Sequence, residues 1–318
     1  MRLKPSKALR FLGGLVIGAL VLGFLVLRVS SCAPAPPPAI VVPPAPPRPP
    51  DPSPEPTSPE PTATPQAACG VGPALAARAN QASLQTLAWA PFGRAETGWE
   101  TYAPLIGREI RSSCAPGEPG FAAAVADWEA TRSLPADGML SIELFNRMKS
   151  EIQMRRPFVR LSAQRICPDP PAPDGLAQAT PQEGYSGKVI QLRPAALEAW
   201  RRMAAAARLE DPAIAADSRN LTIFSGFRGP SDDATRCLRE GNCNGVVRAS
   251  CSAHRTGLAM DLYVGQASGF GPDSSADANR LFMSRTPAYR WLVANAARFG
   301  FVPYPFEPWH WEWTGEAP

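Results

Sequence analysis

A proline-rich segment near the N-terminus limits where this chain of 318 residues can build a folded domain. The stretch reads PAPPPAIVVPPAPPRPPDPSPEPTSPEPTATP and has almost no large apolar side chains. Because proline fixes φ and lacks a backbone donor, such a stretch forms no core and favours the extended polyproline II conformation. At about 3.1 Å per residue it would span up to roughly 100 Å. We therefore assign residues 33–67 as a stalk and expect the folded domains after it.

The N-terminal segment, residues 1–32, has the pattern of an export signal or membrane anchor. Its first ten residues carry four basic side chains, and the apolar run FLGGLVIGALVLGFLVL follows. A basic flank before an apolar run is typical of exported proteins, although this run suits both a signal and a short membrane span. The following VSSCAP resembles a bacterial lipoprotein processing site, with lipid on Cys32. We expect an extracytoplasmic protein, membrane-anchored by this segment or by that lipid.

The cysteine count agrees with export. The chain has seven cysteines, and six remain if Cys32 carries lipid. An even set of cysteines without a CxxC spacing favours structural disulfides in an oxidising compartment, and it argues against a zinc ribbon. Cys69 and Cys114 flank the first helical segments and are candidates to pair. The six are Cys69, Cys114, Cys167, Cys237, Cys243 and Cys251.

The net charge of +4 is too small to indicate a nucleic-acid partner, and no basic cluster occurs beyond the N-terminus.

After the stalk, residues 68–158 are expected to be a small helical module, since apolar residues recur at helical spacing in PALAARANQASLQTLAW and GFAAAVADWEATRSL. The Asp137-Gly138 pair predicts a turn, and Ser141 is expected to cap the next helix. Residues 159–183 are rich in proline and are expected to be a linker.

The remainder, residues 184–318, is expected to form an α+β domain with a small antiparallel sheet, flanking helices and a zinc site. Helical patterns alternate with short β-forming runs, and few strands are present. The segment LRPAALEAWRRMAAAARL predicts an amphipathic helix, and TPAYRWLVANAARFG predicts another that ends at Gly300. Extended structure is expected in LTIFSGFR, AMDLYVG and VPYPFEPWHWEW.

Both histidines of the chain lie close to carboxylates in this domain. In CSAHRTGLAMDLY, His254 and Asp261 are separated by Gly257, which predicts a turn that brings the two side chains together. With His310 they form a candidate set of metal ligands. Two imidazoles and one carboxylate suit Zn²⁺, and a fourth position open to water is typical of a catalytic site.

In WHWEW the strand period of two places Trp309, Trp311 and Trp313 on one face and His310 and Glu312 on the other. The tryptophans are expected to pack, and the histidine to face the site. Glu307 precedes this strand, where a bend could aim it at the same place. Periodicity does not choose between Glu307 and Glu312 as a catalytic base.

Two other catalytic arrangements are less consistent with the sequence. A Ser-His-Asp hydrolase would need a GxSxG elbow, which is absent, and Ser225 in SGFR lacks an expected following helix. Cys251 lies near His254 and could act as a thiol nucleophile. The even set of six cysteines favours a disulfide for Cys251 instead.

Three motifs carry a resemblance to a known family. SCSAHRTGLAMDL fits the pattern S-x-H-x-x-G-x-A-x-D, EPWHW fits E-x-W-H, and SGFR fits S-G-[YF]-R, in family order. Together they resemble the zinc D-alanyl-D-alanine carboxypeptidases of the vancomycin-resistance type, within the group that includes lysostaphin-type endopeptidases and the hedgehog domain. The resemblance implies that His254, Asp261 and His310 bind zinc and that Glu307 is the catalytic base.

The same resemblance implies roles for three further residues. Arg228 would stabilise the developing oxyanion or hold a substrate carboxylate, and Ser225 and Ser252 would shape the pocket. The implied reaction removes the terminal D-alanine of peptidoglycan stem peptides. An endopeptidase of the same zinc family and a catalytically inactive wall-binding protein are the alternatives, and the retained Glu307 argues against the inactive one.

The segments after SGFR and before the histidine motif differ from the family pattern. After SGFR the chain continues GPSDDATRC, and CLREGNCNGVVRASC precedes the histidine motif, so the substrate-binding loop is expected to differ from the family. Upstream, FAAAVADWEATRSLPADGMLSIELFNRM resembles the small helical peptidoglycan-binding module. The alternative for this stretch is a helical bundle that supports the next domain. Peptidoglycan stem peptides, and the membrane through the N-terminus, are therefore the expected partners.

Overall fold

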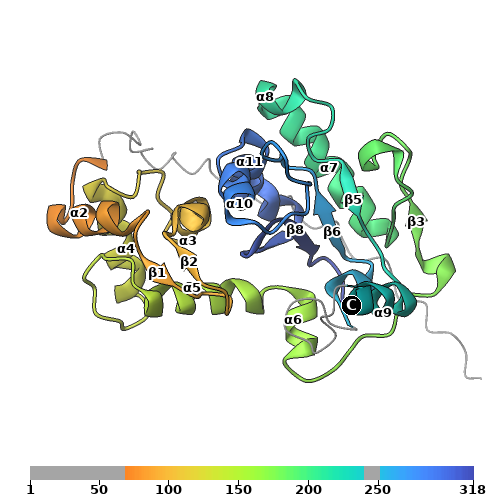
Figure 1. The fold of residues 1–318 in the computed structure, drawn as a ribbon, viewed down its shortest axis with the longest axis horizontal. Helices are drawn as coiled ribbons and strands as arrows, with labels where there is room; N and C mark the ends of the chain where they lie inside the picture. The colour runs from red at the N-terminus through yellow and green to blue at the C-terminus, as the bar shows by residue number, and fades with distance from the viewer. Residues whose placement is uncertain (1–68, 240–250) are drawn as a thin grey trace, which may run out of the picture. The chain divides into compact units, whose positions relative to one another are not determined.

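The computed structural model describes residues 69–239 and 251–318 (Figure 1). The expectations for the N-terminal anchor, Cys32, the stalk and Cys243 lie outside these residues. In the two described ranges, no helix combines the length and the apolar character needed to cross a membrane.

Residues 69–162 form a mainly helical region, as the apolar spacing predicts, with one small hairpin. The hairpin was not expected: the helical spacing continues to Trp89, whereas the helix ends at Ser83. The turn between the two short strands contains Pro91 and Gly93, which has φ of +75°. The elements are α2 (Ala74–Ser83), β1 (Ala88–Trp89), β2 (Glu96–Thr97), η1 (Glu100–Tyr102), α3 (Ala103–Glu109), α4 (Pro119–Ala130), α5 (Ile142–Met154) and α6 (Pro157–Ser162).

The turn before α5 is held by two buried polar side chains. Asn80 donates to Gly138 O at 2.9 Å and accepts from Leu140 N at 2.7 Å, and Glu129 accepts from Gly138 N at 2.9 Å. Gly138 has φ of +72°, and a Cβ there would meet Ala122 O at 2.6 Å, so glycine is required. Ser141 accepts from Leu144 N, which confirms the expected N-cap.

The cysteines of the described residues form disulfides. Cys69 pairs with Cys114, as expected, and Cys167 pairs with Cys251. Cys237 is disulfide-bonded as well. Since Cys251 is bonded, it does not act as a thiol nucleophile.

The second region is α+β, with a four-stranded antiparallel sheet in the order β5-β6-β8-β7. This confirms the expected fold class. The helices predicted around residues 192–209 and 286–300 are α7 and α11 with η5, and Gly300 ends the latter with φ of +82°. The elements are η2 (Pro173–Gly175), β3 (Ala177–Gln178), η3 (Tyr185–Gly187), β4 (Gln191–Leu192), α7 (Pro194–Glu210), α8 (Pro212–Ala215), β5 (Ile223–Ser225), α9 (Pro230–Arg239), η4 (Ala253–Thr256), β6 (Ala259–Leu262), α10 (Asp277–Ser284), α11 (Pro287–Asn295), η5 (Ala296–Phe299), β7 (Phe301–Tyr304) and β8 (Glu307–Trp313).

The last extended run differs from the expectation. It is a hairpin of two paired strands, β7 and β8, because the chain turns at Pro305-Phe306. The expected linker also contains structure: β3 pairs with β4. α9 and α10 lie in polar segments whose helical pattern the sequence analysis did not recognise.

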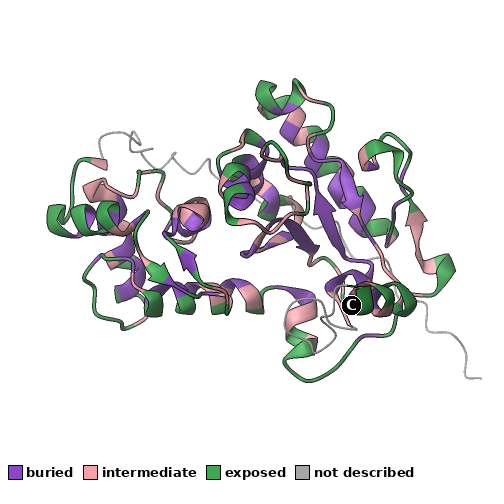
Figure 2. Ribbon diagram, viewed as in Figure 1, coloured by how far each residue is buried: buried purple, intermediate pink, exposed green. Residues whose placement is uncertain are grey.

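One face of the sheet forms the main core. Met260, Leu262, Trp309 and Trp311 pack with apolar side chains of α7 and α11, and Figure 2 shows the central strands in the colour of buried residues. The tryptophans of β8 therefore pack as the strand period predicts. The opposite face of β6 and β8 carries Asp261, His310 and Glu312.

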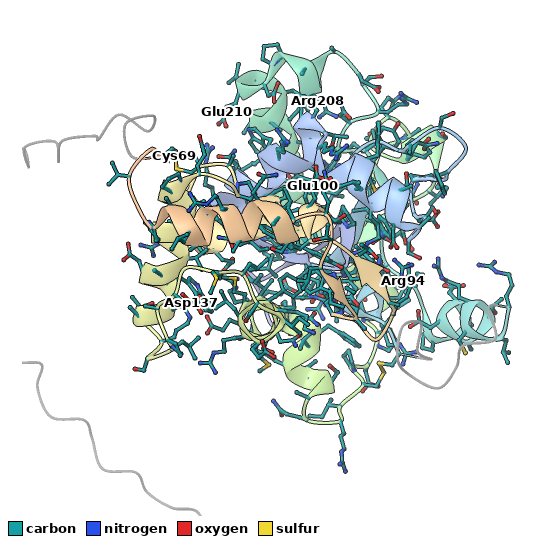
Figure 3. The ribbon with its side chains drawn as sticks, turned by 60° about the vertical axis from the view of Figure 1, so that its left-hand side comes forward. Cys69, Arg94, Glu100, Asp137, Arg208 and Glu210 are labelled. Carbon is teal, nitrogen blue, oxygen red and sulfur yellow. A yellow bond between two sulfur atoms is a disulfide. The ribbon has the colours of Figure 1, made fainter. Side chains whose placement is uncertain are left out.

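The helical region contacts the sheet region through charged side chains. Arg94 pairs with Asp277, and Glu100 pairs with Arg285; Arg94 and Glu100 are labelled in Figure 3. A buried arginine, Arg280, also donates to Tyr102 of the helical region.

Candidate metal centre

Three neighbouring strands place a row of polar side chains across the sheet. Ser225 of β5 is the register partner of Asp261 on β6, and Asp261 is the register partner of His310 on β8. Directly opposed residues of antiparallel strands point to the same face with close Cβ atoms. As a result, Asp261 Oδ1 lies 2.9 Å from His310 Nδ1.

His254 reaches the same place from η4, just before β6. Gly257 ends η4 with φ of +69°, in the left-handed region that glycine adopts without strain, and the chain then turns into β6. His254 Nε2 lies 3.3 Å from Asp261 Oδ2. One ligand atom from each of His254, Asp261 and His310 lies within 4.8 Å of the other two.

This donor set fits a zinc ion. With bonds of about 2.0–2.1 Å, a tetrahedral zinc separates its ligand atoms by about 3.3 Å, close to the observed spacing. His254 Nδ1 lies 2.7 Å from Gly226 O. A carbonyl only accepts, so Nδ1 carries the hydrogen and the lone pair of Nε2 faces Asp261, as metal-ligating histidines require.

Burial and charge set the protonation of the three groups. Burial, with Arg228 acting in the same direction, lowers the pKa of His254 to about 4. Burial also favours neutral His310, but hydrogen bonds with Asp261 and Glu312 outweigh it and raise the pKa of His310 to about 9. Burial alone would raise the pKa of the Asp261 carboxyl, but the two imidazoles outweigh burial and hold this pKa well below the usual value. His254 is thus neutral and Asp261 is ionised, as metal ligands must be, whereas His310 would release a proton when a metal binds.

Glu307 and Glu312 lie in different surroundings. The pairing of β7 with β8 shifts register at Pro303/Tyr304, so that Tyr304 is opposite Glu307. Glu307, the first residue of β8, thereby departs from the alternation of the tryptophans and lines the pocket with His310. Glu312 is 1% exposed and accepts from Arg156 at 2.6 Å. Of the two glutamates, Glu307 lines the pocket, and Glu312 is paired with Arg156.

The other expected site residues lie around the same pocket, which has a volume of about 270 Å³. Arg228 Nη1 donates to Ser225 Oγ at 2.7 Å and lies 3.9 Å from Asp261. Burial lowers the pKa of Arg228, partly opposed by Asp261. Ser252 donates to Asp233 at 2.7 Å instead of contacting the three candidate ligands directly.

Two buried residues of the site were missed by the sequence analysis. Asp233 of α9 accepts from both the backbone and the side chain of Ser252 and lies 3.6 Å from Arg228. Arg156, between α5 and α6, lines the pocket and pairs with Glu312. The sequence gives no signal for Arg156, whereas the aspartate pair after SGFR was visible but unassigned.

Two histidines and an aspartate that meet beside a separate glutamate define a candidate metal centre with a carboxylate poised at its pocket. A family model described as VanY, D-alanyl-D-alanine carboxypeptidase, matches residues 189–316. This match agrees with the resemblance that the three motifs carry. All the candidate ligands, Glu307 and Arg228 lie within the matched residues.

A similar solved structure is that of the LdcB LD-carboxypeptidase, a structure described as revealing the molecular basis of peptidoglycan recognition. It is 25% identical, covers 46% of this chain and 72% of its own, and has a TM-score of 0.34. The search of curated proteins gave no match.

Proposed function

We propose that the protein is a zinc-dependent D-alanyl-D-alanine carboxypeptidase that removes the terminal D-alanine of peptidoglycan stem peptides. The observation that carries the proposal is the meeting of His254, Asp261 and His310 in one pocket with Glu307, inside the family-matched region. The description of the matched family suggests the substrate, and the two imidazoles and one carboxylate suggest zinc as the metal.

The pocket residues divide the chemistry among them. His254, Asp261 and His310 would hold the zinc ion, which supplies Lewis acidity toward a carbonyl oxygen and a lowered pKa for a water molecule. Glu307 takes a proton from the attacking water as the new C–O bond forms. It then delivers that proton to the amine nitrogen of the departing D-alanine as the C–N bond breaks.

Arg228 would bind negative charge of the substrate. Its guanidinium is held by Ser225 and lies near Asp261, so its position relative to the ligands is defined. A fixed donor fork suits either the carbonyl oxygen that gains charge in the transition state or the terminal carboxylate. Ser225 positions Arg228, and Ser252 shapes the pocket wall together with Asp233.

We further propose that residues 69–158 bind the cell wall and that the chain works outside the cytoplasm, held at the membrane by its N-terminal segment. The disulfides suit an oxidising compartment. The helical region contacts the sheet region through ion pairs, which would hold the two regions side by side on the wall.

Defined muropeptides test the proposal. The purified protein is incubated with pentapeptide and with cross-linked dimers, with and without a chelator, and the products are identified by mass spectrometry. Free D-alanine that disappears on chelation is the expected result. Cleaved cross-links without free D-alanine would make the protein an endopeptidase, and binding to the wall without any product would make it a wall-binding protein.

A further inference from the structure

A buried arginine from outside the family-matched residues 189–316 reaches the candidate metal centre. Arg156 lies between α5 and α6 and is 6% exposed. Its Nε donates to Glu312 Oε1 at 2.6 Å, across 156 positions of sequence. Both residues belong to the same compact unit of the chain.

Glu312 is held on both of its carboxylate oxygens by this segment. Arg156 binds Oε1, and the backbone N–H of Phe158 donates to Oε2 at 3.1 Å. Oε1 also lies 3.5 Å from His310 Nε2, and Arg156 Nη2 lies 3.5 Å from the same ring nitrogen. A continuous chain of contacts therefore runs from the helical region through Glu312 to His310 and on to Asp261.

Arg156 is itself fixed by its neighbours. Its Nη1 donates to Gln153 Oε1 at 2.6 Å, and its guanidinium lies 4.3 Å from the centre of the Tyr304 ring. Pro157, at the start of α6, constrains the backbone that follows. These contacts fix the orientation of the Arg156 side chain, so that its Nε faces Glu312.

A role in stability alone does not account for this pair. Removing two charges from water carries a large desolvation penalty, so well-packed apolar side chains often stabilise a protein as much as a buried ion pair does. What apolar side chains cannot do is accept a hydrogen bond from an imidazole. Metal-ligating histidines are oriented by such acceptors on their other ring nitrogen.

We propose that Arg156 is a positioning residue for the metal centre: with the Phe158 N–H it holds Glu312, and Glu312 orients His310 so that Nδ1 faces Asp261. The helical region is then part of the catalytic unit, in addition to any role in wall binding. This inference rests on the proposed function for the importance of the metal. The orientation of the ring is a property of the metal-free protein as well.

The two histidines of the chain allow a direct test, because ¹⁵N-histidine labelling gives signals from only His254 and His310. In the metal-free protein the variant Arg156→Met is expected to shift the ring signals of His310 and leave those of His254 in place. The double variant Arg156→Met/Glu312→Met removes both charges, so it should fold even where the single variant does not. Arg285→Met, at an exposed ion pair of the same interface, is the control and should leave both rings unchanged.

Zinc affinity, measured by competition with a chelator, is the second readout. Loss of the partner of a metal ligand typically costs 10–100-fold in affinity, and we expect about that loss in the double variant. In Arg156→Ala, guanidinium ions but not equal sodium chloride should restore affinity. Unchanged His310 signals and unchanged affinity in a folded double variant would overturn the proposal. If the wild-type protein binds no zinc, the proposed function fails, and the ring signals alone decide the role of Arg156.

Discussion

The helical region and the site face of the sheet both bury polar side chains, but they do so with different partners. In the helical region Asn80 and Glu129 bind backbone groups around Gly138, and these contacts fix a turn. On the sheet, His254, Asp261 and His310 meet one another across neighbouring strands. Buried groups bonded to backbone stabilise a fold, whereas titratable side chains that converge on one point are arranged for a ligand or for chemistry.

This difference predicts that substitutions in the two regions change different quantities. Changes at the pocket should alter rate or metal binding with little change in the free energy of unfolding. Changes in the helical region away from the Arg156–Phe158 segment should alter stability and leave the chemistry of the folded protein intact. The following substitutions test that separation from the largest effect to the smallest.

Glu307→Gln is expected to lower kcat by about 10²–10⁴-fold, the usual contribution of a general base, because the amide cannot take a proton from water. Zinc content and the denaturation midpoint should stay at wild-type values, since Glu307 is half-buried at the pocket rim and is outside the proposed ligand set. Release of D-alanine and metal content are measured on the same preparation. Glu198→Gln, an exposed carboxylate on α7, is the matched control, and a kcat equal to wild type for Glu307→Gln would remove the base from the mechanism.

Phe145→Ala addresses the opposite region. Phe145 is 3% exposed and packs on the rings of Trp89 and Tyr102. Its loss should reduce the free energy of unfolding by about 3–5 kcal/mol, because a cavity replaces a buried ring. Urea denaturation measures the change. At low temperature, where the variant remains folded, kcat should be near wild type; a large loss of kcat at full folding would show that the core of the helical region is coupled to the chemistry.

The separation also explains what the sequence could and could not predict. The candidate ligands and the packed tryptophans follow from rare residue types and the strand period of two, which are local signals. Periodicity could not choose between Glu307 and Glu312; the family resemblance pointed to Glu307, and the register shift between β7 and β8, which periodicity does not contain, accompanies its place in the pocket. The contact of Arg156 with Glu312 could not be predicted, because the two residues are 156 positions apart and the local sequence around Arg156 has no motif or periodicity that indicates a site residue. The hairpin of β7 and β8 was wrongly taken as one run, since both strands are apolar and the turn between them is short.

Removal of the disulfide in Cys69→Ala/Cys114→Ala is expected to lower the free energy of unfolding by about 2–4 kcal/mol, because the bond closes a loop of 45 positions and restricts the unfolded chain. The measurement is denaturation of the double variant beside the wild type. Release of D-alanine by the folded variant should be unchanged. Wild-type stability would mean that the helical region is held by its contacts with the sheet region rather than by this crosslink.

Ser141→Ala should have the smallest effect, about 1 kcal/mol of unfolding free energy, because it removes the hydroxyl that accepts from Leu144 N at the start of α5. Ser150→Ala is the matched control, since Ser150 bonds its own helix at Asn146 O and is exposed. That variant should stay within about 0.5 kcal/mol of wild type. α5 leads directly to Arg156, so zinc affinity of the Ser141 variant adds a finer measurement. If a change at the far end of α5 weakens zinc binding, the helical region transmits strain to the metal centre; if affinity is unchanged, the link is confined to the segment from Arg156 to Phe158.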